Sequence, residues 1–235
     1  WTKMAAKGTN GTNGTDVGTT ITTQGDLLYR DGSGLQRLAK GTAGQALKMN
    51  TAANAPEWGT ISSDFVRIAN VNATTGSSIS FNNVFSSSDG YQSYHVKVHN
   101  WKPSATRWLK FRWRDSGSDL SDNYRWRLAG HRITGGNSGQ TANYESASSD
   151  YIPITYWSQN SDRIGHGTID LGNPSTSSNG HSIMSHFTVI ESDNGYVYEP
   201  GGGFRTGTAT YDGFSIIDSG GSNFSNMDVS VYGIK

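Results

Sequence analysis

Aromatic and basic side chains are concentrated in the middle of the chain, and both kinds of group can bind carbohydrate. Four of the seven tryptophans lie between residues 101 and 126, and nine of the 19 lysines and arginines lie between residues 97 and 132. Indole rings stack on the apolar faces of sugars, and a guanidinium group can form two parallel hydrogen bonds with a carboxylate or phosphate. This region is therefore a candidate for contact with acidic polysaccharide or phosphate-bearing lipopolysaccharide. The alternative for the basic residues is ion pairing with acids elsewhere in the chain or in another subunit.

Alternation of apolar and polar residues separates candidate binding residues from candidate core residues. Three alternating runs, 94–99, 109–114 and 124–128, predict strands, which we expect to be neighbours with a shared basic outer face. Trp113 and Trp126 have the parity of the apolar residues, so both are expected in the core. The candidate binding residues of this region are Trp108, Arg112 and Arg114 on the basic side of the strands, and Trp101 in a loop.

A second aromatic group surrounds the long polar segment 134–150. Its members are Tyr144, Tyr151, Tyr156 and Trp157, and amide and carboxylate side chains flank them. Aromatic rings beside amides and carboxylates suit a neutral glycan, because the rings stack on the sugar and the polar groups fix its hydroxyls. The same residues equally suit a loop that is held together by its own side chains. We take Tyr144, Tyr151 and Trp157 as further candidate glycan-binding residues.

Catalytic and metal-binding patterns are weak. Carboxylates are numerous, but nothing in the sequence selects the closely spaced pair that a glycosidase needs. No Gly-X-Ser-X-Gly motif occurs, and Gly201-Gly202-Gly203 lacks the sequence context of a phosphate-binding loop. The six histidines contain no His-X-His pair, and cysteine is absent. The sequence predicts no enzyme, no catalytic residues, no cofactor and no metal.

Composition narrows the class of protein and of partner. Only 16% of the 235 residues are charged, 30 are glycine, and the 19 basic and 19 acidic residues cancel. Such a chain has no overall electric field that would draw it to nucleic acid or to a membrane surface. No apolar stretch approaches the roughly 20 residues that span a bilayer. We expect neither a nucleic-acid partner nor membrane insertion.

The spacing of the strand signals predicts an all-β protein. Further strand candidates follow the three runs above, each bounded by Gly, Ser, Asn or Pro, and no long amphipathic helix is predicted. Residues 61–235 are therefore expected to form an antiparallel β-sandwich, jelly-roll-like head. Its binding residues should lie on the longest polar connections, expected as loops at 115–123, 134–150, 172–180 and 199–210.

The first 60 residues are organised differently. Residues 1–24, with their Gly-Thr-Asn triplets, are expected to be a flexible connector. Residues 25–60 read as short strands joined by turns, each with only two or three apolar residues. Such strands gain too little burial to offset the entropy of ordering them. Other copies of the chain must therefore cover them, as in an intertwined stalk.

Four short motifs carry a resemblance to a known family: GDLLY at 25–29, LQRL at 35–38, GQALKMN at 44–50 and APEW at 55–58. In this order they resemble the stalk repeat of bacteriophage tail fibres. The stretches YDGFSI at 211–216 and VSVYGIK at 229–235 resemble two strands of fibre head domains.

The resemblance implies a homotrimeric virion fibre with an intertwined trimeric β stalk, located in the phage tail or capsid fibre and assembled in the host cytoplasm. Its implied function is adhesion to a host cell-surface glycan or lipopolysaccharide, and its implied partners include other phage virion proteins. One alternative is a purely structural component, such as a connector, collar or capsid-attached fibre. A glycan depolymerase is a further alternative.

Overall fold

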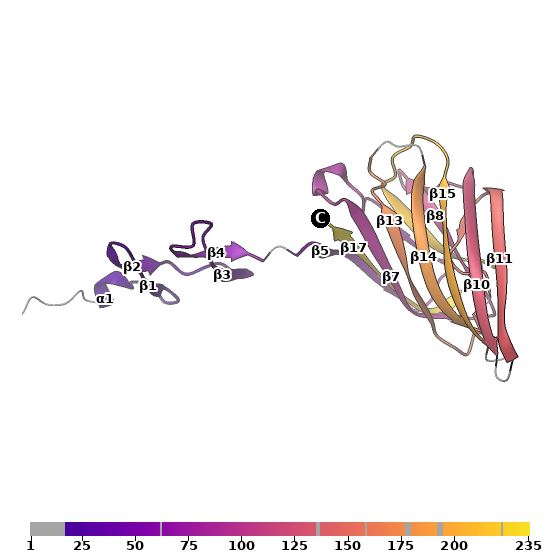
Figure 1. Cartoon of the computed structure of the whole chain (residues 1–235), viewed down its shortest axis with the longest axis horizontal. Helices are drawn as coiled ribbons and strands as arrows, with labels where there is room; N and C mark the ends of the chain where they lie inside the picture. The colour runs from indigo at the N-terminus through magenta and orange to yellow at the C-terminus, as the bar shows by residue number, and fades with distance from the viewer. Residues whose placement is uncertain are drawn as a thin grey trace, which may run out of the picture. The chain divides into compact units, whose positions relative to one another are not determined.

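The chain forms an all-β structure in two compact units, Trp1–Ser63 and Asp64–Lys235, drawn in Figure 1. The computed structural model describes residues 17–61, 63–134, 137–157, 159–176, 180–191, 195–221 and 223–235. Most of the predicted connector, residues 1–24, lies outside these ranges. Within it, Val17–Thr20 form a single helical turn, α1.

The N-terminal unit consists of two β-hairpins. Strand β1 (Leu27–Asp31) pairs with β2 (Gly34–Leu38), and β3 (Gln45–Met49) pairs with β4 (Pro56–Thr60). The Arg37 guanidinium lies 2.7 Å from the Asp26 carboxylate and, with the backbone N–H groups of Thr23 and Lys40, lowers the pKa of Asp26 to about 2. These polar contacts join the two ends of the β1–β2 hairpin.

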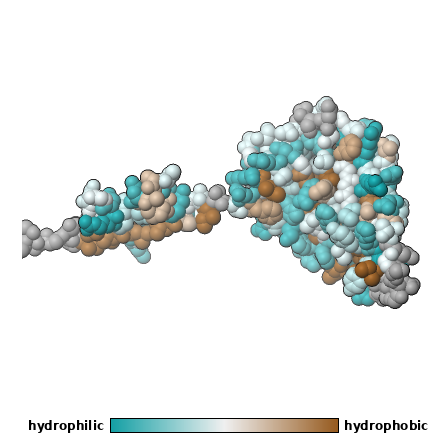
Figure 2. All heavy atoms as spheres, in the orientation of Figure 1, coloured by the Kyte–Doolittle hydropathy of each residue, from teal (hydrophilic) through white to brown (hydrophobic). Residues whose placement is uncertain are grey.

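No apolar residue described between residues 17 and 61 is buried. The apolar side chains of Leu27, Leu35, Leu47 and Met49 are between 37% and 53% exposed. Figure 2 shows apolar residues gathered along one side of this unit. The described residues of this unit therefore leave an apolar side uncovered.

The C-terminal unit is a sandwich of two antiparallel sheets. The large sheet has eight strands in the order β11-β10-β15-β14-β13-β7-β17-β5. Their bounds are β5 Phe65–Ala73, β7 Ser93–Pro103, β10 Tyr124–Thr134, β11 Asn137–Ser149, β13 Gly165–Gly172, β14 His181–Ile190, β15 Tyr196–Arg205 and β17 Phe224–Ile234. The small sheet has five strands: β12 (Ile152–Pro153), β8 (Leu109–Asp115), β16 (Gly213–Asp218) and β6 (Ser78–Phe81), with β9 (Ser118–Asp119) beside β8.

One hydrophobic core lies between the sheets, and alternate residues of the strands supply it. Phe214 of β16 is fully buried, with its ring centroid 4.9 Å from that of Phe81 and 5.6 Å from that of Phe111. From the large sheet, Val96, Val229 and Ile169 are also fully buried. The coarse prediction of an all-β chain with large antiparallel sheets is thus confirmed.

The predicted basic face is wrong, because the three basic runs do not lie on neighbouring strands. β8 belongs to the small sheet, whereas β7 and β10 belong to the large sheet and are separated by β13, β14 and β15. The outer residues of β8 therefore lie on the opposite face of the sandwich from those of β10. Alternation had identified which residues face outward but carries no information on sheet membership.

Two predicted loops are largely strand. Residues 137–149 form β11, an edge strand whose Ser-, Thr- and Asn-rich sequence lacks an apolar alternation. Residues 199–205 continue β15 through Pro200 and three glycines. The β10–β15 register skips from Gly201 to Tyr198, so the ladder is interrupted beside Pro200, which has no N–H to donate.

Trp101 lies in β7 and is fully buried, so the expectation of a loop residue is wrong. The preceding residue, Asn100, has φ +52°, and the pairing of β7 with both neighbouring strands shifts register here. This irregularity changes the alternation and turns the indole into the core. The ring is therefore unavailable to a sugar in this structure.

We expect Phe214→Ala to lower the free energy of unfolding of the protein by about 3–5 kcal/mol, because it removes a buried ring from between several others. Phe204→Ala is the matched control: Phe204 is 38% exposed on the large sheet, and its loss should cost about 0.5 kcal/mol or less. Urea unfolding followed by tryptophan fluorescence measures both. Equal losses in the two variants would contradict the assignment of the core.

Candidate functional site

Five aromatic rings gather beneath β10 and β11, where the large sheet extends beyond the small one. Tyr156 stacks on Tyr144, with centroids 3.9 Å apart, and lies 6.3 Å from both Trp108 and Trp126. Trp157 meets Tyr144 edge to face at 6.3 Å. We call these five residues the aromatic cluster. The structure thus brings together three of the predicted binding residues, Trp108, Tyr144 and Trp157.

A buried carboxylate holds the segment that carries two of these rings. Glu199 of β15 is fully buried, and its Oε1 accepts hydrogen bonds from the backbone N–H groups of Tyr156 and Trp157, both at 2.7 Å. Burial raises the pKa of Glu199 to about 7, although the two N–H groups favour the charged form. Its Oε2 has no hydrogen-bond partner among the described residues. Glu199 thus positions the aromatic cluster at an electrostatic cost.

The aromatic cluster is packed rather than open. Trp157 lies against Gly130, where an added Cβ would come within 1.9 Å of its ring. Of the five residues, only Tyr156 is exposed, at 38%, and the other four are half-buried. Because Tyr144 and Tyr156 stack on each other and Trp157 packs on Gly130, these rings offer little surface to a sugar. The arrangement matches the alternative in which the segment is held together by its own side chains.

The predicted arginines of β8 are engaged in ion pairs on the outer face of the small sheet. Arg112 pairs with Asp150, and Arg114 pairs with Asp119. The ammonium of Lys110 lies 4.5 Å from the centre of the Tyr151 ring, a cation–π contact. For Arg112, Arg114 and Tyr151 the structure therefore favours a role in holding this face together.

A groove of about 710 Å³ lies on the outer face of the large sheet, across β11, β10, β15 and β14. Its lining residues are Arg125, Trp126, Arg127, Glu145, Ser146, Ala147, Ser182, Ile183, Gly202, Gly203 and Phe204. Figure 1 shows these four strands side by side. Gly202 has no side chain, so the sheet is shallow between the flanking Arg127 and Met184, its register partners. The missing side chain makes room for the groove.

The charged residues of the groove are not engaged elsewhere. Arg125 and Arg127 are exposed, and among the described residues neither guanidinium has an ion pair or hydrogen bond. Glu145 faces Arg127 across the β10–β11 pair and is likewise exposed. On the other side, Phe204 lies between Arg125 and Ser182 in the strand register. The groove therefore combines two free cations, a carboxylate, a hydroxyl and an exposed ring.

Sequence reasoning missed this groove although it had counted Arg125 and Arg127 among the basic residues. The available signal was Gly201-Gly202-Gly203, because consecutive glycines within a strand leave the backbone open to a close neighbour. The polar character of the segment 199–210 instead predicts a loop. The partner across the groove, Phe204, lies in the same segment and was not identified as a binding residue.

Two kinds of site are absent from the part of the chain that the structure describes. No three His, Cys, Asp or Glu side chains lie together in a way that could hold a metal ion. No helix there is long and apolar enough to cross a membrane.

Glu199→Gln should change how stability depends on pH. In the wild type the raised pKa of Glu199 means that protonation of this carboxyl favours the folded state. Its contribution to the free energy of unfolding is complete below about pH 4.5 and is lost as the pH rises to about 7, a difference of about 3 kcal/mol. The amide keeps the Oε1 acceptor but has no charge to desolvate. The variant should therefore gain about 3 kcal/mol relative to wild type between pH 4 and pH 8.

Urea unfolding at the two pH values measures this gain. Glu145→Gln, at an exposed carboxylate, is the control and should leave the pH dependence as in the wild type. Parallel pH curves for Glu199→Gln and wild type would show that Glu199 is not an electrostatic burden on the fold.

Comparisons with known proteins give no match: no family model, no curated protein and no solved structure matches this chain. The function is therefore inferred from the groove, from the described contacts and from the sequence pattern of residues 25–58.

Proposed function

We propose that the protein is a homotrimeric phage fibre protein that attaches to a host cell-surface glycan or lipopolysaccharide. In this proposal residues 25–60 form an intertwined trimeric stalk, and the jelly-roll-like head, residues 61–235, binds through the groove. The protein acts in the virion, is assembled in the host cytoplasm and has other virion proteins as partners. The observation that carries the proposal is the pair of unengaged guanidiniums, Arg125 and Arg127, beside the exposed ring of Phe204.

The groove supplies the groups that reversible recognition of a sugar requires. The guanidiniums of Arg125 and Arg127 donate hydrogen bonds to a carboxylate, phosphate or hydroxyl oxygen. The Ser182 hydroxyl and the Glu145 carboxylate accept hydrogen bonds from sugar hydroxyls. The ring of Phe204 offers an apolar face at the edge of the groove. Binding needs no bond to be made or broken.

The contrast with the other basic residues supports the choice of this site. Arg112, Arg114, Arg132 and Arg205 are each paired with a carboxylate, so a ligand would have to displace an intramolecular partner to reach them. Arg125 and Arg127 have no such competitor among the described residues. A ligand anion therefore gains the full interaction with them.

The N-terminal unit supports the trimer. Its hairpins expose Leu47 and Met49 on β3 and Leu27 and Leu35 on β1 and β2, and no described residue between 17 and 61 is buried. Three copies wound together would cover these side chains with one another. Linking three heads also raises the effective concentration of each, so that weak contacts with a repetitive glycan add up to durable attachment.

Replacing both groove arginines should remove most of the binding. We expect Arg125→Gln with Arg127→Gln to weaken binding by about tenfold or more for an acidic ligand, since each hydrogen bond to a charged group is worth about 1.5–3 kcal/mol. An array of bacterial polysaccharides and lipopolysaccharides gives the measurement. Arg67→Gln, at an exposed arginine of β5 near the opposite edge of the same sheet, is the matched control and should bind as wild type.

If the wild type forms trimers yet binds no glycan on the array or on intact host cells, adhesion through the head is contradicted. The purely structural virion role then becomes the better proposal.

Polar substitution on β3 should break the trimer. Leu47→Ser with Met49→Ser removes apolar area that we assign to contacts between copies, so sedimentation should show a smaller assembly than for the wild type. Lys48→Ser lies between the two positions on the same strand and removes only an exposed ion pair with Glu57, so it should sediment as wild type. A monomeric wild type would contradict the trimer itself.

A further inference from the structure

The outer face of β15 continues beyond the groove as a row of aromatic and small residues. Alternate residues of the strand face outward, and along β15 these are Phe204, Gly202, Pro200, Tyr198 and Tyr196. Tyr198 is 47% exposed and Tyr196 60% exposed. From Phe204 to Tyr196 the row spans about 26 Å at about 3.3 Å per residue. The row is therefore much longer than a single sugar ring.

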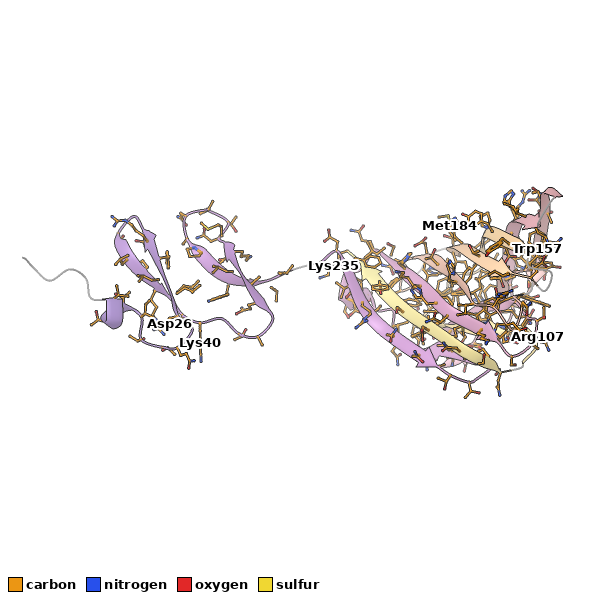
Figure 3. All side chains as sticks on the ribbon, turned by 90° about the horizontal axis from the view of Figure 1, so that it is seen from below. Asp26, Lys40, Arg107, Trp157, Met184 and Lys235 are labelled. Carbon is orange, nitrogen blue, oxygen red and sulfur yellow. The ribbon has the colours of Figure 1, made fainter. Side chains whose placement is uncertain are left out.

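Side chains of the neighbouring strands extend this row into a platform. The His186 ring of β14 lies parallel to that of Tyr198, with an interplanar angle of 7° and centroids 6.2 Å apart. Met184, 57% exposed, lies between His186 and the groove and projects outward from the sheet in Figure 3. On the other side His131 of β10 is the register partner of Tyr198. Tyr198 thus has an imidazole-bearing residue beside it on each neighbouring strand, and its ring is partly open.

No acidic side chain faces outward from these three strands. The described outward residues are Arg125, Arg127, Ala129, His131 and Ile133 on β10, Ser182, Met184, His186, Thr188 and Ile190 on β14, and the five of β15 named above. Glu199, the one carboxylate within the strands, is buried on the inner face. A polyanion along β15 therefore meets two cations and one carboxylate, Glu145 of β11, at the groove and no further repelling charge on these three strands.

We propose that Tyr198 and Tyr196, with Met184 and His186 beside them, form a second subsite for an extended acidic polysaccharide whose acidic group binds Arg125 and Arg127 in the groove. The chain of sugars lies along β15, and its further rings rest on the tyrosines. Phenol rings suit this task because each offers an apolar face and a polar hydroxyl. The proposal rests on the proposed function, since it assigns the ligand of the same groove to a chemical class and a minimum length.

The test compares long and short ligands on the full chain. Polygalacturonate, a uronic acid polymer, is the long probe, a galacturonate oligomer just long enough to fill the groove is the short probe, and neutral dextran is the uncharged probe. Tyr198→Ala should weaken binding of the long probe about three- to tenfold and leave the short probe unchanged. Tyr232→Ala, on the outer face of β17 away from β15, should change neither, and dextran should not bind.

The possible results separate this proposal from the function on which it rests. If Arg125→Gln with Arg127→Gln abolishes binding but Tyr198→Ala leaves the affinity for long chains unchanged, the subsite is wrong and the groove stands. If the wild type binds no acidic or neutral glycan, the proposed function is contradicted, and the second subsite is overturned with it. If Tyr198→Ala instead lowers the sedimenting mass, the platform is an interface between copies, and the subsite is overturned.

Discussion

The head depends on covering one sheet with another that has fewer strands. Eight strands form the large sheet and five the small one, so the small sheet has too few strands to cover the whole inner face of the large one. β12 and the aromatic cluster fill this space, with Trp157 against Gly130 and Tyr156 against Tyr144. Glu199 fixes the backbone of that segment by accepting two N–H groups. The carboxylate is buried because it must reach this segment from the inner face of β15.

The two faces of β10 and β15 therefore have different roles. Inward residues such as Leu128 and Val197 seal the core, whereas Arg125, Arg127 and Phe204 face outward and are exposed. On the small sheet the outward arginines are tied to carboxylates, whereas Arg125 and Arg127 on the large sheet are not. Gly202, which lacks a side chain, lowers the surface between them and Met184. The groove that we propose as the binding site thus lies where outward arginines are not used for charge pairing.

Strand alternation predicted much of the fold but not the pairing of strands. The runs around 94–99, 109–114 and 124–128 are strands, and Trp113 lies in the core as its parity required. Which strands share a sheet depends on contacts between residues far apart in the chain, so β8 could not be separated from β10 by local pattern. The sequence did not predict the polar edge strand β11 or the Pro-Gly-Gly-Gly part of β15, for a related reason. Partner strands hold these segments in place, and their own residues carry no strand signal.

The sequence indicated the kinds of residue that could bind a ligand, but it did not indicate where on the fold the groove lies. Trp108, Tyr144 and Trp157 do belong to one cluster, in which Tyr156 contacts both Trp108 and Tyr144, yet all three are half-buried. Trp101 is buried because strand β7 is irregular at Asn100, and the periodicity of the sequence does not reveal this irregularity. Arg125 and Arg127 had the correct outward parity, but the groove depends on Gly202 and Phe204 being beside them, a consequence of the β10–β15 register.

A structure of the protein with a bound acidic oligosaccharide tests the central claim most directly. We predict ligand density over Gly202, with an acidic group within hydrogen-bonding distance of Arg125 or Arg127 and a sugar ring against Phe204. Density on the outer face of the small sheet beside Arg112 and Tyr151, or within the aromatic cluster, would contradict it.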